Sequence, residues 1–215
     1  MEKKWYTELV KNEMDGLIPL LKLFKDEEDF YLHFISNTLF FKIEHVEAQK
    51  DKFAIMTSEK EKFPVRYSEK SNKHFHFLNE SNARGFSVKK FKNRTEAKKF
   101  STDYELYFTN NLNSSSDELI KVIIDKDGNY AVRDEIKTRT GYRVSQGVLM
   151  SDFSNYMICH VWGKTTHPLF FTSLWNVALI PNYLSFITDK TDENSAISRK
   201  SKKIIKAICY ELYKP

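Results

Sequence analysis

The sequence predicts an α+β protein, in which a mixed N-terminal region of helices and short strands is followed by a β-hairpin, a ββα unit and a closing helix. Hydrophobic residues make up 41% of the 215 positions and aromatic residues 14%, which suits a compact core. Apolar residues recur at helical spacing near both ends of the chain and in short runs between them. With only 6 Gly and 5 Pro, the composition excludes a disordered or fibrous chain.

Two helices are predicted at the N-terminal end. Leucines and other apolar residues occur at helical spacing between residues 5 and 24, and a second apolar stretch, 30–41, follows the acidic turn 26–29. The second stretch also has some strand character. From about 43 to 80 the apolar runs are short and aromatic, which predicts short strands and loops.

The most basic part of the chain is the stretch 82–100. It has seven cations against the single acid Glu96, and the cations are Arg84, Lys89, Lys90, Lys92, Arg94, Lys98 and Lys99. Such a stretch is able to follow a phosphate backbone, and Phe86 or Phe91 would offer a stacking face. A solvated helix whose phenylalanines point into the core explains the pattern equally well.

A polar run at 110–116 interrupts all periodicity and predicts a boundary near residue 117. We expect 1–117 to bind DNA or a partner and 118–215 to be the catalytic region. After the boundary, apolar runs at 119–124 and 130–132 flank Asp125–Asn129, whose Gly128 and Asn129 accept positive φ easily. This pattern predicts a β-hairpin.

A helix is predicted to close the chain from Ser195 onward. One side of it carries the apolar residues and the other most of the lysines and arginines; the apolar residues are Ile197, Ile204, Ile205, Ile208 and Leu212. We expect this helix to pack by its apolar stripe, with Cys209 near it.

The segment before that helix predicts strand, long loop, strand and helix. The first strand lies in 155–163, the second in 175–181, and Pro181 suits the first turn of a helix that runs to about Lys190. An antiparallel pairing with residue 160 opposite 176 would place their side chains on one face. His160 and Asn176 would then point into the same space.

This ββα layout, with His160 closing the first strand and Asn176 opening the second, resembles the His-Me finger (HNH-like) nucleases, although the resemblance covers only the last third of the chain. It implies that His160 is the general base, since imidazole titrates near neutrality. It also implies that Asn176 holds Mg²⁺ (or Mn²⁺), with Asp189 as an auxiliary ligand. The implied function is metal-dependent endonucleolytic cleavage of DNA.

Two positions depart from that family's pattern. The residue before the base is Cys159, and the helix position of the third motif residue is Ser185. Neither is a good Mg²⁺ ligand. They favour the alternative that the chain is a non-catalytic nucleic-acid-binding or adaptor protein that keeps a degenerate finger as scaffold.

The net charge of +5 and the isoelectric point near 8.9 favour a polyanionic partner, and we expect double-stranded DNA. Arg139 and Arg143, shortly before the finger, are candidates for gripping a phosphate, although ordinary loop arginines would look the same. Restriction, defence and homing enzymes all suit the pattern. A cutter of palindromic sites would be a two-fold homodimer.

We expect a cytoplasmic protein that spans no membrane, since no signal-like segment or long apolar stretch is present. The two cysteines, Cys159 and Cys209, match neither a zinc site nor a disulfide framework and are expected to stay reduced.

Overall fold

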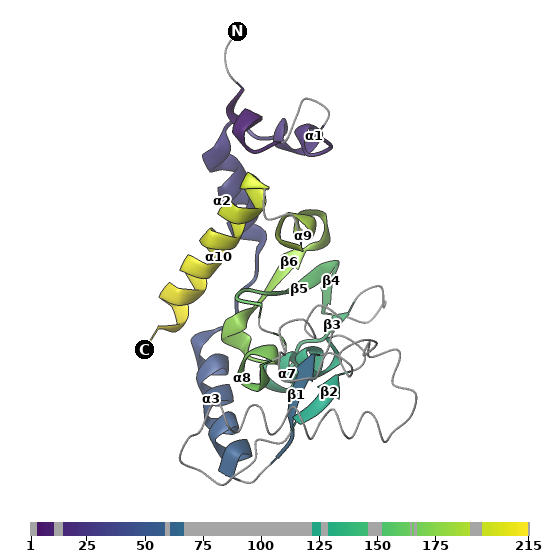
Figure 1. The fold of residues 1–215 in the computed structure, drawn as a ribbon, viewed down its shortest axis with the longest axis vertical. Coiled ribbons are helices and arrows are strands. Elements are labelled where there is room, and N and C mark those ends of the chain that lie inside the picture. Colours follow the sequence, from purple (N-terminus) through teal and green to yellow (C-terminus); the bar gives the residue numbers. More distant parts are fainter. Residues whose placement is uncertain are drawn as a thin grey trace, which may run out of the picture. The chain divides into compact units, whose positions relative to one another are not determined.

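The structure is a computed structural model that describes residues 4–10, 15–58, 61–66, 122–125, 129–145, 152–163, 165, 167–189 and 195–214. Within these ranges, helices accompany short strands in small two-stranded sheets, which confirms the α+β class (Figure 1). The chain forms two compact units, each assembled from separate segments. The first comprises 1–43, 143–162 and 177–215, and the second 44–142 and 163–176. The expected boundary near residue 117 falls outside the described ranges and stays a prediction.

At the centre of the first unit is an antiparallel strand pair, β5 (Tyr156–His160) and β6 (Val177–Pro181), with α9 (Asn182–Asp189) directly after β6 (Figure 1). The predicted strand, strand and helix are confirmed. All five residues of β6 are buried, and Leu39 bridges to Leu179 on the side away from β5. β6 is therefore an interior strand, whereas the residues of β5 are half-buried.

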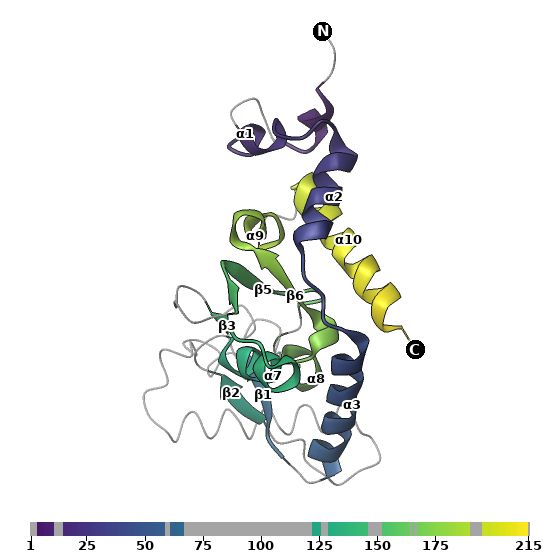
Figure 2. The ribbon, with the colours of Figure 1, turned by 180° about the vertical axis from the view of Figure 1, so that it is seen from behind.

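Two longer helices complete the first unit, α2 (Glu27–Asn37) and α10 (Ala196–Tyr213), which lie side by side (Figures 1 and 2). Asp26 caps the N-terminus of α2, and its side chain accepts from the backbone N–H of Asp29. It ends at Asn37, and the following extended residues supply the bridge at Leu39, so the mixed helix and strand character predicted for 30–41 is confirmed.

The predicted helix over 5–24 is wrong as a continuous element. The structure has a 3₁₀ turn at Trp5–Glu8 and a one-turn helix, α1 (Ile18–Leu21), with Gly16 and Pro19 close to its start. Both residue types interrupt or begin helices rather than extend them. Two short strands, β3 (Val144–Ser145) and β4 (Phe153–Ser154), pair in parallel elsewhere in this unit.

The second unit contains α3 (Ile43–Ser58), where the sequence predicted short strands and loops. That prediction was wrong for 43–58. Two of its side chains that are nearly inaccessible to solvent, Val46 and Gln49, stand three apart, which is helical spacing. The short apolar run at 53–56 misled the prediction, because it looks like a strand although it belongs to the last turns of the helix.

The β-hairpin predicted around 125–129 is also wrong. β2 (Val122–Asp125) pairs in parallel with β1 (Phe63–Arg66), and residues 130–140 form α7 (Tyr130–Thr140). Val132 and Ile136 are fully buried at i, i+4 spacing, so the run that looked like a strand is the first turn of an amphipathic helix. The Asp125 carboxylate accepts from the backbone N–H of Ala131 and satisfies one free donor of that turn.

Candidate functional site

The strand pair of the ββα unit is shifted by one residue from the predicted register. His160 lies opposite Val177, and Ile158 lies opposite Leu179, rather than opposite 176 and 178. The prediction failed because every residue of β6 is apolar, so no alternation distinguishes one register from the next. Asn176 belongs instead to a 3₁₀ turn, Leu174–Asn176, that precedes the strand.

His160 is the last residue of β5, and its side chain is half-buried. A half-buried side chain keeps part of its surface within reach of solvent, as a side chain that exchanges protons with water must. Cys159, the departure from the family pattern, is also half-buried. His160 belongs to the first compact unit.

Asn176 belongs to the second unit and has no exposed surface. Its side-chain Nδ2 donates to the carbonyl of Gly163 at 3.1 Å and to that of Phe170 at 2.8 Å. Both carbonyls lie in the segment that leads from β5 to β6. The amide nitrogen therefore braces that segment, and the metal-ligand role of Asn176 stays a prediction.

A second brace of the same segment was missed from the sequence. Gln49 of α3 is 1% exposed; its Nε2 donates to the carbonyl of Thr172 at 2.8 Å, and its Oε1 accepts from the N–H of Leu174 at 2.7 Å. The segment also contains the one-turn helix α8 (Pro168–Phe171), capped by the His167 Nδ1, which accepts from the N–H of Leu169. Only an unexpected Gln on an apolar helix face would have indicated this contact.

The other predicted site residues are placed as follows. Asp189 is the last residue of α9, and its side chain is outside the described part of the chain. Arg143 is exposed and lies beside β3, where its backbone N–H donates to Asp152. The cations Arg84, Lys89, Lys90, Lys92 and Arg94 all lie outside the described residues.

Arg139 lies on α7 and forms an ion pair. The sequence did not indicate this pair. The Glu135 carboxylate, 8% exposed, accepts from Arg139 Nε at 2.9 Å and from Lys52 Nζ at 2.7 Å. Burial would raise the pKa of Glu135, but the hydrogen bonds and charges of Lys52 and Arg139 outweigh it and lower the pKa. Arg139 thus pairs with a buried carboxylate of its own helix, and Lys52 joins α3 to the same carboxylate.

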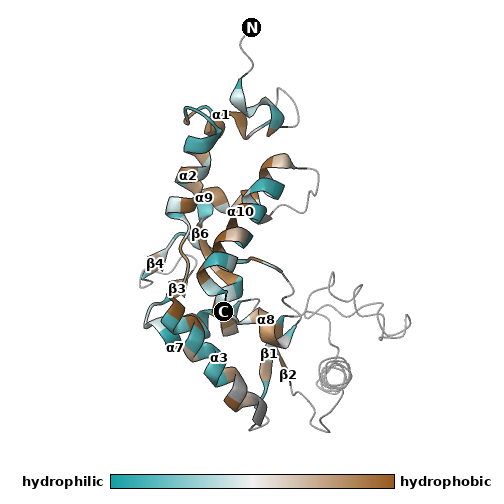
Figure 3. Cartoon of the chain, turned by 90° about the vertical axis from the view of Figure 1, so that its left-hand side faces the viewer, coloured by the Kyte–Doolittle hydropathy of each residue, from teal (hydrophilic) through white to brown (hydrophobic). Residues whose placement is uncertain are grey.

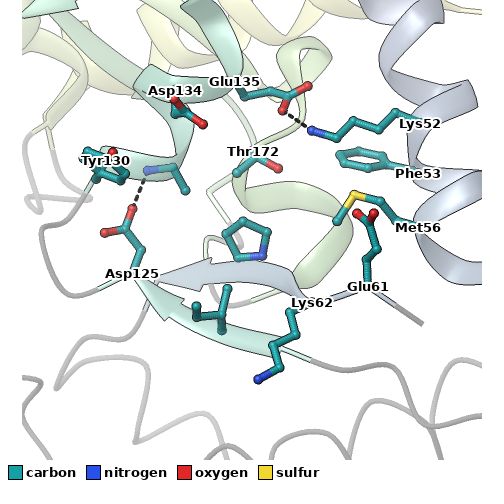
Figure 4. A pocket seen from close by; sticks show the side chains of 13 residues that line it. Lys52, Phe53, Met56, Glu61, Lys62, Asp125, Tyr130, Asp134, Glu135 and Thr172 are labelled. Atoms are coloured by element: carbon teal, nitrogen blue, oxygen red, sulfur yellow. Dashed lines mark hydrogen bonds and ion pairs between the residues drawn. The ribbon is translucent and has the colours of Figure 1, made fainter. Parts of the chain in front are cut away.

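A cavity of about 450 Å³ opens in the second unit next to this ion pair. Figure 4 shows Lys52, Phe53 and Met56 of α3 on one side, Asp134 and Glu135 of α7 on another, and Asp125 at the end of β2. None of the predicted site residues that the structure describes lines it. The described residues that line it include carboxylates and lysines but no His or Cys.

The family comparison places residues 41–215 in a family described as "Uncharacterised protein PM1201". The match covers well over half of the chain, so the protein belongs to that family, and the matched range includes the ββα unit and α10. Comparison with curated proteins and with solved structures found no match. No helix within the described residues is both long and apolar enough to cross a membrane.

Proposed function

We propose that this protein is a metal-dependent nuclease that hydrolyses phosphodiester bonds of DNA, with His160 as the general base. One observation carries the proposal: β5 and β6 form an antiparallel pair, a helix follows β6 directly, and a half-buried histidine ends β5. This is the strand and helix order of the His-Me finger, found around a residue suited to proton transfer near neutral pH.

In the proposed step, His160 accepts a proton from a water molecule while the water oxygen attacks the phosphorus. The new P–O bond forms as the bond to the leaving sugar oxygen breaks, and that oxygen takes a proton from solvent. The balance requires no oxidant or second substrate. A bound divalent cation would supply charge neutralisation at the phosphate.

The described side chains suit only a sparsely held cation. Among them, no three His, Cys, Asp or Glu residues gather closely enough to hold a metal ion. Mg²⁺ commonly keeps several waters and uses one or two protein ligands together with substrate phosphates. Mg²⁺ or Mn²⁺ is therefore proposed as a requirement of the reaction, with Asp189 as a candidate ligand.

The test is cleavage of supercoiled plasmid with Mg²⁺, with Mn²⁺ and with a chelator, for the natural chain and two variants. His160→Ala should lower the rate by about 10² to 10⁴, the usual contribution of a general base. His45→Ala is the matched control, since His45 is also half-buried but lies on α3. Asp189→Ala should have a milder effect than His160→Ala.

Binding of the same DNA and the thermal midpoint should barely change in His160→Ala, because a general base acts on water and adds little affinity. If His160→Ala cuts as fast as the natural chain, the assignment of this segment as a nuclease finger is wrong. Cleavage of RNA but not of DNA would change the proposed substrate from DNA to RNA. The proposed role of His160 would stay the same.

A non-catalytic nucleic-acid-binding protein is the second candidate. The observation that favours it is the buried amide of Asn176, which is committed to two backbone carbonyls and resembles a scaffold contact. Binding of DNA with no cleavage under any of the metal conditions would select this candidate.

A further inference from the structure

α10 carries the largest charge of the described helices. Five cations stand against the single acid Glu211 within Ala196–Tyr213, a net charge of +4, and the cations are Arg199, Lys200, Lys202, Lys203 and Lys206. By the same count α3 has a net charge of −1 and α7 of +1. The stretch 82–100 carries a larger excess but lies outside the described residues, so α10 is the most basic helix that the structure describes.

Packing fixes which way these charges point. The buried residues of α10 follow one stripe, which includes Ile197, Ile205, Cys209 and Tyr213, and the Tyr213 hydroxyl donates to the carbonyl of Phe41 at 2.7 Å. Figure 3 shows the helix divided between hydrophobic and hydrophilic residues. The apolar face of α10 is buried in the core of its own unit. It is therefore not available to insert into a lipid bilayer.

The opposite face presents a line of polar residues. Arg199, Lys203, Lys206 and Tyr210 are all exposed and are separated by four, three and four positions, which places them on one side of a helix. We call these four residues the α10 stripe. Their Cα atoms extend over about 16 Å of helix at 1.5 Å per residue.

Two lysines of the stripe lack a compensating charge. No ion pair joins Lys203 or Lys206 to any described residue, whereas the neighbouring Lys200 is held by Glu27 at 2.6 Å and lies 5.1 Å from the centre of the Tyr31 ring. Lys200 therefore serves the contact between α2 and α10. Lys203 and Lys206 have no such partner among the described residues.

We propose that the α10 stripe binds the phosphate backbone of double-stranded DNA. Duplex DNA presents roughly one charge per 1.7 Å of axis, so the length of the stripe spans several phosphates. Lysine and arginine supply the charge, and the Tyr210 hydroxyl is a further donor to a phosphate oxygen. The contact reads no base sequence.

This inference rests on the proposed function, because it names the surface that holds the substrate of the same unit. α10 packs against α9, and α9 packs against β5, the strand that ends at His160. The surface and the proposed base thus belong to one compact unit.

The test measures the affinity for a fluorescent 30-base-pair DNA in a chelator, so that cleavage plays no part. In the double variant Lys203→Gln/Lys206→Gln, two phosphate contacts are lost. The slope of log affinity against log salt should flatten by about 1.8, since each neutralised phosphate contributes about 0.9. The affinity itself should fall roughly tenfold or more at 0.1 M salt.

The matched control is Lys50→Gln/Lys137→Gln, which removes the same net charge from exposed positions on α3 and α7. It should leave the slope unchanged. An equal loss in both double variants would show an effect of total charge and overturn the proposal, as would an unchanged slope in the α10 variant. Binding to vesicles of anionic lipid without affinity for DNA would also overturn it.

Failure of the proposed function has a different signature. A natural chain that binds DNA through the α10 stripe but never cleaves it would reject the nuclease and leave the stripe in place. A chain that cleaves DNA with an unchanged slope in the α10 variant would reject the stripe and leave the nuclease in place.

Discussion

The two compact units bury different kinds of polar side chain. Among the described residues, the buried polar side chains of the first unit are all hydroxyls of Ser or Thr, whereas those of the second include the amides of Gln49 and Asn176 and the carboxylate of Glu135. The hydroxyl of Thr38, for example, donates to the carbonyl of Phe34, one turn back. The amide of Gln49 instead reaches a residue 123 positions away.

The difference teaches where each unit is vulnerable. The first unit depends on apolar fit around β6, and its charges point outward on α10. The second unit depends on a few long-range polar contacts. Loss of one partner leaves the other buried and unpaired, which lowers stability by more than the intact contact contributes. A change that leaves a cavity should therefore damage the first unit most, and a change that leaves an unpaired polar group should damage the second.

The largest expected effect is that of Leu184→Ala in the first unit. Leu184 of α9 is fully buried, so truncation should lower the free energy of unfolding by about 2–5 kcal/mol. Urea denaturation measures it. Leu212→Ala is the matched control, because Leu212 of α10 is 47% exposed and should change stability by less than about 0.5–1 kcal/mol. Equal losses in both variants would contradict the burial of α9.

The same contrast explains how far the sequence predicted the fold. The strands around His160 and the helix from Ser195 were predicted correctly, because their apolar patterns are long and are packed within one unit. The predicted stripe of α10 was rotated slightly, since Tyr213 is buried and Leu212 is not. α7 was mistaken for a strand because three residues after a turn do not distinguish period 2 from period 3.6.

The candidate site was predicted less fully than the fold. The position of His160 at the end of a strand followed from the local pattern, but the burial of Asn176 and its two carbonyl partners did not. Those contacts depend on the path of the connecting segment, to which Gln49 of α3 also contributes. No local pattern in one sequence encodes a contact over such a separation.

The next largest loss of stability is expected when Asn176 is replaced. Replacement by Ala leaves the carbonyls of Gly163 and Phe170 without their donor, which should cost about 1–3 kcal/mol of unfolding free energy. Asn176→Asp separates two roles, since a carboxylate keeps a metal ligand but loses both N–H donors. If the brace matters, both variants lose stability, and Asn176→Asp loses at least as much as Asn176→Ala because it also buries a carboxylate against two carbonyls. If Asn176 binds metal, Asn176→Asp keeps metal-dependent cleavage and Asn176→Ala regains part of it at higher metal concentration.

The smallest expected effect concerns Glu135→Gln and its dependence on pH. The substitution keeps the shape and an acceptor but removes the charge that Lys52 and Arg139 stabilise, so it should cost on the order of 1 kcal/mol at pH 7. Because the folded state lowers the pKa of Glu135 below its ordinary 4.5, the carboxylate stabilises the fold fully above that value. This stabilisation is lost as the pH falls through the lowered pKa, because both states are then protonated.

The difference in unfolding free energy between the natural chain and Glu135→Gln should therefore stay constant from pH 7 to about 5 and shrink below 4.5. Glu211→Gln is the control: Glu211 pairs with Lys214 at 2.5 Å, but the two side chains are 65% and 49% exposed, and such pairs contribute little. Its stability should follow that of the natural chain at every pH. A difference for Glu135→Gln that grows as the pH falls would mean that burial outweighs the two cations. The carboxylate would then oppose the fold, and the second unit would not depend on this ion pair.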